Sequence, residues 1–87
     1  MNIINFQAMM EETRALVKEN LTNKDKCPRY MTEKQLKLIL AELDKMEMAK
    51  NSHLFYPYYP KGISDSWDYS DPLGIKLLEL LELYCKL

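Results

Sequence analysis

The chain has 87 residues, of which 47% are hydrophobic and 29% are charged, and its formal net charge is -1. This length predicts one helical domain over residues 1–87 with marginal stability, because so short a chain buries only about 60% of the surface that it exposes when unfolded. The composition excludes a disordered chain, and the small net charge gives no overall attraction to nucleic acid or anionic lipid.

The first predicted helix covers residues 5–21. Apolar side chains recur there at steps of three and four residues, while charged side chains occupy the opposite face. The apolar face consists of Phe6, Met9, Met10, Thr13, Leu16, Val17 and Leu21. Residues 20–30 have no such periodicity and predict a polar connecting loop.

The second predicted helix covers residues 32–51 and has the clearest start signal in the sequence. Thr32 and Gln35 have the spacing of a capping box, and Met31 can pack on Leu36 as a hydrophobic staple. The apolar stripe that follows consists of Leu36, Ile39, Leu40, Leu43 and Met46. These features fix the register of this helix.

Residues 52–70 are predicted to form a long loop. The segment 55–69 holds six of the nine aromatic residues together with Pro57, Pro60 and Gly62, which argue against a long helix. A proline pushes the residue before it toward extended geometry, so Tyr56-Pro57 and Tyr59-Pro60 predict a stiff extended run. The aromatic residues are Phe55, Tyr56, Tyr58, Tyr59, Trp67 and Tyr69.

The third predicted helix covers residues 71–87, with Asp71 as its N-cap and Pro72 in its first turn. Its apolar residues cover most of its circumference, so it must be buried on most sides. They are Leu73, Ile75, Leu77, Leu78, Leu80, Leu81, Leu83, Tyr84 and Leu87. Two neighbouring helices cover about half of such a helix, so the remainder needs either the folded-back aromatic loop or another chain. The predicted fold is an all-α domain of three helices with an aromatic, proline-rich loop between the second and the third.

No motif in the sequence has the specificity of a catalytic or metal-binding signature. The single histidine, His53, stands near a helix end, where histidine more often complements the helix dipole. Asp65, Asp68 and Asp71 recur at steps of three residues, but they lack the ligand pattern of a calcium loop and suit turns and caps. With two glycines in the chain, no phosphate-binding glycine-rich loop is possible. We therefore expect no enzyme, no cofactor and no metal site.

Binding of nucleic acid is also disfavoured. Stacking of single-stranded bases needs a basic groove around the aromatic rings, but Lys61 alone accompanies them, together with three aspartates. The lysines and the arginine between residues 24 and 37 are expected to form a solvated surface. No basic segment followed by an apolar one begins the chain, and no apolar run approaches the roughly 20 residues that span a bilayer. We expect a cytoplasmic protein that does not bind membranes.

Two cysteines, Cys27 and Cys85, are not in a metal-ligand spacing and would stay reduced in the cytoplasm. Cys85 lies near the end of an apolar helix, and we expect it to be packed. Cys27 precedes a proline in a loop, where either an exposed or a buried thiol fits the sequence.

The remaining class of function is protein recognition. Tyrosine and tryptophan give a large contact area at low entropic cost, and they dominate the energetically important residues of interfaces. We expect Phe55, Ile63 and Trp67 to point inward and some of the tyrosines to point outward. The predicted partner-binding residues are Tyr56, Tyr58, Tyr59, Tyr69, Asp65 and Asp68.

Three segments together resemble the small helical immunity proteins that inhibit nuclease bacteriocins. They are the segment from Thr32-Glu33-Lys34-Gln35-Leu36 to Lys45, then Tyr58-Tyr59-Pro60, and then Asp71-Pro72-Leu73-Gly74-Ile75. The resemblance covers about half of the chain and concerns the type of surface. It implies that Tyr58 and Tyr59 contact a protein partner.

The sequence thus predicts a non-enzymatic protein-binding or inhibitor module, with an immunity-like or antitoxin-like surface. Its partner would be another protein of unknown identity. The alternative is a structural or regulatory homo-oligomer, for example a homodimer, in which the third predicted helix forms the interface (the seam) between the copies.

Overall fold

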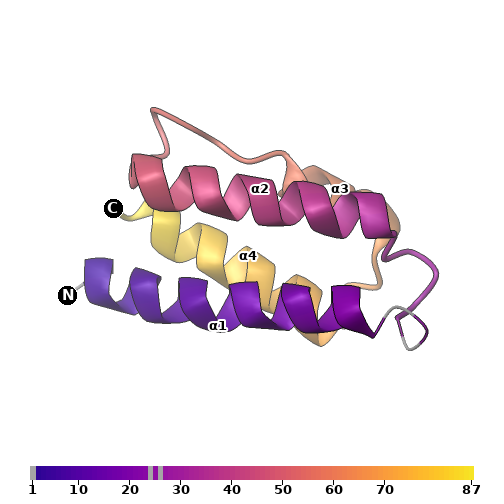
Figure 1. Ribbon diagram of the computed structural model, residues 1–87. Coiled ribbons are helices and arrows are strands. Elements are labelled where there is room, and N and C mark those ends of the chain that lie inside the picture. The colour runs from indigo at the N-terminus through magenta and orange to yellow at the C-terminus, as the bar shows by residue number, and fades with distance from the viewer. Residues whose placement is uncertain (1, 24, 26) are drawn as a thin grey trace.

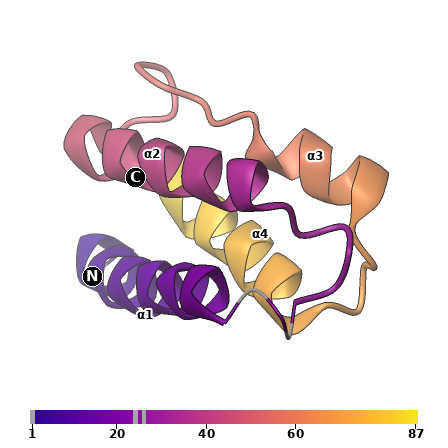
Figure 2. The same cartoon turned by 45° about the vertical axis from the view of Figure 1, so that its right-hand side comes forward.

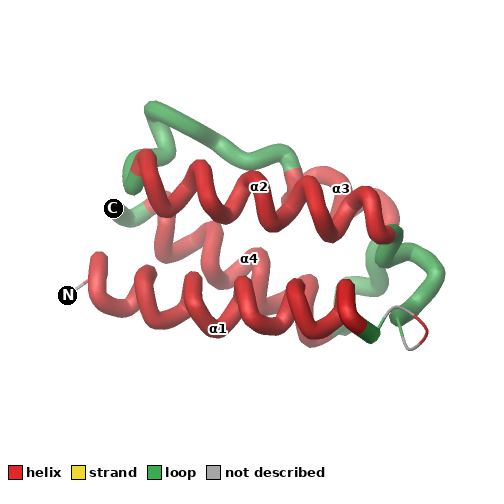
Figure 3. Tube along the Cα trace, viewed as in Figure 1, coloured by secondary structure: helices red, strands yellow, loops and turns green. Residues whose placement is uncertain are grey.

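The computed structural model describes residues 2–23, 25 and 27–87, and this part of the chain contains four helices (Figures 1 and 3). They are α1 (Asn2–Thr22), α2 (Glu33–Ala49), α3 (Tyr59–Ser66) and α4 (Pro72–Cys85). The predicted all-α class is confirmed. The predicted number of helices is wrong by one, because α3 lies inside the segment that was expected to be a loop.

Helix α1 packs against both α2 and α4, which run in the opposite direction, so the start of α1 lies near the end of α4 (Figure 1). Helix α3 lies beside the first half of α2 and over the start of α4 (Figure 2). One hydrophobic core joins all four helices. Its buried side chains are Phe6, Met10, Val17, Met31, Leu36, Ile39, Leu43, Met46, Tyr59, Ile63, Trp67, Leu73, Leu77, Leu80 and Tyr84.

The apolar faces predicted for the first two helices are the faces that the structure buries. In α1 the most buried positions are Phe6, Met10, Thr13 and Val17, and in α2 they are Leu36, Ile39, Leu43 and Met46. Helix α1 begins at Asn2, earlier than expected, whereas α2 ends at Ala49, two residues before the predicted end. Periodicity therefore located the buried faces better than the helix ends.

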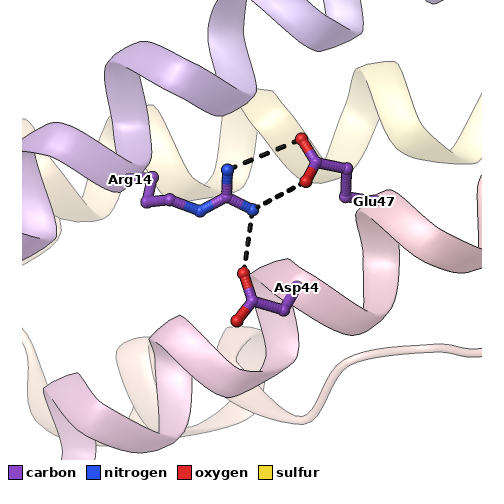
Figure 4. A network of polar contacts seen from close by, with 3 residues as sticks. All are labelled: Arg14, Asp44 and Glu47. Carbon is purple, nitrogen blue, oxygen red and sulfur yellow. Dashed lines mark hydrogen bonds and ion pairs between the residues drawn. The ribbon is translucent and has the colours of Figure 1, made fainter.

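Polar contacts also hold α1 to its neighbours. The guanidinium of Arg14 donates to Asp44 at 3.0 Å and to Glu47 at 3.2 Å, both on α2 (Figure 4). Lys76 of α4 forms an ion pair with Glu12 of α1. These charges lie at the rim of the core, where ion pairs add little stability but fix which helix faces meet.

Helix α2 starts as the sequence predicts. The Thr32 hydroxyl accepts a hydrogen bond from the Gln35 main-chain N–H at 3.1 Å. The second half of a capping box would use the Gln35 side chain, but its Oε1 instead accepts a bond from the Trp67 indole N–H at 2.9 Å. The side chain that was expected to complete the cap thus ties α2 to the end of α3.

The expectation that Tyr59-Pro60 is an extended run is wrong, because Tyr59 opens α3 with Pro60 in its first turn. Proline is tolerated there, since the first N–H groups of a helix have no intrahelical acceptor. Tyr59 and Ile63, one turn apart, are the buried residues of α3. This apolar pair covers α2 and α4, which gives a short helix the tertiary contacts that it needs.

Helix α4 begins at the predicted N-cap, and neighbouring segments bury much of its apolar surface. Asp71 Oδ1 accepts bonds from the N–H groups of Leu73 at 2.9 Å and Gly74 at 3.1 Å. The segment from Tyr59 to Trp67 lies on the side of α4 that α1 leaves open, so the predicted loop does fold back over this helix. Helix α4 ends at Cys85, not at residue 87, and Cys85 is exposed although we expected it to be packed.

Among the described residues, no helix is long and apolar enough to cross a membrane.

Candidate partner-binding surface

Two consecutive tyrosines at the start of α3 have opposite environments. The Tyr59 side chain is buried, and its hydroxyl donates to the main-chain carbonyl of Leu77 in α4 at 2.8 Å. Tyr58 is 83% exposed, and its main-chain N–H donates to the carboxylate of Glu42 on α2. The exposed ring therefore stands on a main chain that is attached to α2 on one side and to α4 on the other.

Burial of Tyr59 raises the pKa of its phenol far above the ordinary range, and the nearby negative charge of Glu42 adds to this effect. The hydroxyl is a neutral donor to Leu77. Tyr59 was predicted to bind a partner, but the structure places its side chain in the core, directly after the exposed Tyr58.

Beside Tyr58, the linker between α2 and α3 runs back along α2 (Figure 3). Leu54 and Tyr56 on this linker are 75% and 55% exposed, and Leu38 on α2 is 56% exposed. Phe55, between them, is partly buried under Lys45 of α2, whose Nζ lies 5.7 Å from the ring centroid. We call Leu38 and Tyr58, which line one hollow, together with Leu54 and Tyr56 on the linker that leads to Tyr58, the tyrosine edge.

Two hollows meet at Leu38. One, of about 150 Å³, lies between α2 and α3, and the other, of about 390 Å³, lies along the first turns of α2. The smaller hollow is lined by Gln35, Leu38, Ile39, Glu42, Tyr58, Tyr59 and Gly62. The larger one is lined by Glu33, Lys34, Lys37 and Leu38. The smaller hollow is mainly apolar and lies next to an exposed ring, so a side chain of a partner can fill it.

Tyr69 and Asp68, which were also predicted to bind a partner, lie on another part of the surface. They line a shallow hollow of about 720 Å³ with Tyr30, Ser66, Trp67 and Ser70. Asp68 accepts bonds from the Ser70 hydroxyl at 2.7 Å and from the Ser70 N–H at 2.9 Å, and these bonds hold the pKa of its carboxyl below the usual range. Asp65 is exposed on α3 and lines none of these hollows. The structure therefore does not bring the six predicted residues into one site.

Two residues that line these hollows, Leu38 and Tyr30, were not among the predicted site residues. Leu38 falls off the apolar stripe of α2, and a leucine in that position is the signal that could have identified it. Tyr30 lies in the loop before α2, and its hydroxyl donates to Asp71 Oδ2 at 2.6 Å. This bond raises the pKa of Tyr30 to about 12, with further contributions from burial and from the charges of Asp71 and Asp68.

The chemistry considered for the aspartates and for the histidine has local explanations. Asp71 is a helix cap, and Asp68 closes a turn. His53 is exposed, and its main-chain N–H donates to Asn51 Oδ1 at 2.8 Å. In the described part of the chain, no group of three or more histidine, cysteine, aspartate or glutamate side chains is arranged to hold a metal ion.

The sequence matches no model of a known protein family, and no curated protein or solved structure shows significant similarity to it. The resemblance to the bacteriocin immunity proteins therefore depends on the three motifs alone.

Proposed function

We propose that this chain is a non-enzymatic module that binds, and in doing so inhibits, another protein through the tyrosine edge. The observation that carries the proposal is the pairing of an 83% exposed Tyr58 with a buried Tyr59. A large amphipathic ring is held in solvent by a main chain that the fold already fixes.

This arrangement favours binding because the main chain at Tyr58 has little conformational entropy left to lose on association. A protein that binds through a flexible loop loses the freedom of that loop on association, which costs affinity. Here Glu42 holds the Tyr58 main chain, and the bond from Tyr59 to Leu77 holds the next residue. A partner that covers Tyr58 therefore gains the contact area of the ring with little further ordering. Such a ring, once desolvated, is worth roughly 2 kcal/mol or more.

The test is affinity capture with three forms of the protein: the unchanged chain, Tyr58→Ala and Tyr69→Ala. Tyr69 is 93% exposed on the other surface, so its substitution is a matched control for the loss of one exposed ring. We expect a partner that is retained by the unchanged chain and by Tyr69→Ala and is lost by Tyr58→Ala, while all three forms melt alike. Equal capture by all three forms would refute the proposal.

A second candidate is a homo-oligomer that uses α4 as its seam. The observation in its favour is that Ile75 and Leu78 on α4 stay 43% and 37% exposed although α1 and α3 both pack against that helix. Light scattering after size exclusion separates the two candidates. A dimer that dissociates in the Ile75→Lys variant would favour the seam, whereas a monomer at all concentrations favours the tyrosine edge.

A further inference from the structure

We propose that the segment that docks on the tyrosine edge is an acidic stretch of a partner protein that carries one apolar anchor side chain. This inference deepens the proposed function and rests on it. It follows from the charges that surround the edge and from the size of the hollow beside Tyr58.

The first step is the supply of cations. Four exposed lysines surround the tyrosine edge, although the whole chain has a net charge of -1. Lys34 and Lys37 line the hollow next to Leu38, Lys45 lies over Phe55, and Lys61 is on α3. Counted with the acids at the same place, Glu33, Glu42 and Asp65, the four lysines leave a local formal charge of +1 (4 - 3), opposite in sign to the net charge of the chain.

The second step is that the acids near these lysines are largely engaged within the chain. Glu33 pairs with Lys37 at 3.7 Å, and Glu42 accepts the main-chain N–H of Tyr58, which fixes the carboxylate in place while it keeps its charge. On the side of α2 that faces α1, Asp44 and Glu47 both bind Arg14 (Figure 4).

What remains around the edge is a set of cations without an anionic partner. Among the described residues, Lys34, Lys45 and Lys61 form no ion pair with any acid, and Asp65 is the one acid on α3. Carboxylates of a partner would form ion pairs with these lysines. Complementary charge of this kind speeds association and selects the partner, and added salt weakens it.

The third step is the apolar anchor. The hollow between α2 and α3 has a volume of about 150 Å³, and three of the polar side chains that line it already have partners: Gln35 accepts from Trp67, Glu42 accepts from the Tyr58 N–H, and Tyr59 donates to Leu77. A space of this size holds a group as large as benzene. A leucine or phenylalanine side chain therefore fits the hollow, whereas a polyphosphate backbone would pair with the lysines and leave it unfilled.

The experiment uses arrays of synthetic peptides with the full chain as the ligand. One set has a central Phe, Leu or Trp among glutamates, a second has lysines in place of the glutamates, and a third has alanine in place of the central residue. We expect binding to the first set alone, and it should weaken as salt is raised. Equal binding to the lysine set, or no binding to any acidic peptide, would overturn the inference.

Matched variants then locate the binding. Lys34→Glu with Lys61→Glu should weaken binding of the acidic peptides about tenfold or more, as loss of charge complementarity predicts. Lys18→Glu with Lys86→Glu makes the same change of charge at exposed positions of α1 and after α4, and it should have little effect. If the control pair weakens binding as much as the test pair, the attraction is not local and the inference is wrong.

Two further outcomes separate this inference from the proposed function. A natural partner that requires Tyr58 but tolerates the Lys34 and Lys61 reversals would leave the proposed function standing and overturn the acidic segment. Peptide binding that Tyr58→Ala does not weaken would overturn the acidic segment alone, whereas a natural partner that Tyr58→Ala retains would overturn the proposed function. Vesicles containing phosphatidylserine, or single-stranded poly(U), that bind in place of the peptides and in a Tyr58-dependent manner would show that the cations serve a lipid surface or a nucleic acid instead.

Discussion

The hydroxyl of Tyr59 donates a 2.8 Å hydrogen bond to the main-chain carbonyl of Leu77, in the middle of α4. The two residues belong to the shortest helix and to the most apolar one. A helical carbonyl has a second lone pair, so it can accept this bond in addition to its bond within the helix. The contact both covers α4 and fixes the base of the tyrosine edge.

Removal of that hydroxyl should lower stability measurably. We expect Tyr59→Phe to reduce the free energy of unfolding by about 1 kcal/mol, the typical net value of one hydrogen bond. Tyr58→Phe removes the same atom from an exposed ring and should change stability by less than about 0.5 kcal/mol. Urea unfolding of both variants checks this prediction. Equal losses in the two variants would mean that the bond to Leu77 contributes nothing.

The cap of α2 gives a second prediction. Thr32→Ala should cost about 1 kcal/mol, because the Gln35 N–H loses its acceptor. Asp71→Ala should cost more, since Asp71 accepts bonds from two main-chain N–H groups and from Tyr30. Denaturation midpoints measured side by side test this order. An unchanged midpoint for Thr32→Ala would mean that α2 starts at another residue in solution.

Fluorescence reports on Trp67, the single tryptophan of the chain. Its side chain is 5% exposed, and its indole lies close to Gly74 at the start of α4. We expect emission that is blue-shifted from that of free tryptophan and weakly quenched by acrylamide. Gln35→Ala removes the acceptor of the indole N–H and should destabilise the protein by about 1 to 3 kcal/mol. Emission like that of free tryptophan would contradict the packing of α3 on α4.

Stability should fall in alkaline solution because of Tyr30, whose pKa the bond to Asp71 raises from 10.0 to about 12. Below about pH 10 the phenol keeps its proton in both states, and its contribution to stability is complete. Between about pH 10 and 12 the unfolded state releases the proton first, so the free energy of unfolding decreases as the pH rises. Urea unfolding at a series of alkaline pH values should show a shallower decrease for Tyr30→Phe. Parallel decreases in both proteins would contradict this role of Tyr30.

The three longer helices could be predicted from the sequence because their apolar residues repeat over several turns, and α2 and α4 also have a capping residue at their start. Helix α3 could not. It has eight residues, a proline in its first turn and two buried side chains, so its existence depends on contacts with Leu77 and α2 that no local pattern encodes. The extended geometry expected before Pro60 was overridden by those contacts.

The candidate site was predictable to a similar extent. From the sequence, some of the tyrosines were expected to point outward, and in the structure Tyr58 does so whereas Tyr59 is buried. The identity of the inner ring depends on the position of Leu77, which is a property of the folded chain. Leu38 lies off the apolar stripe of α2 and was not among the predicted site residues, yet it is exposed and lines the same hollow as Tyr58.

The short length of α3 has a consequence for the motion of the native protein. A helix with two buried side chains can detach while α1, α2 and α4 stay associated, so its amides should exchange with deuterium through a local opening that needs less free energy than global unfolding. A ligand that contacts Tyr58 on one side and Leu38 on the other binds the closed form alone, and by mass action it suppresses the opening. Slower exchange at α3 would therefore report that the tyrosine edge is occupied, even for a ligand whose own structure is unknown.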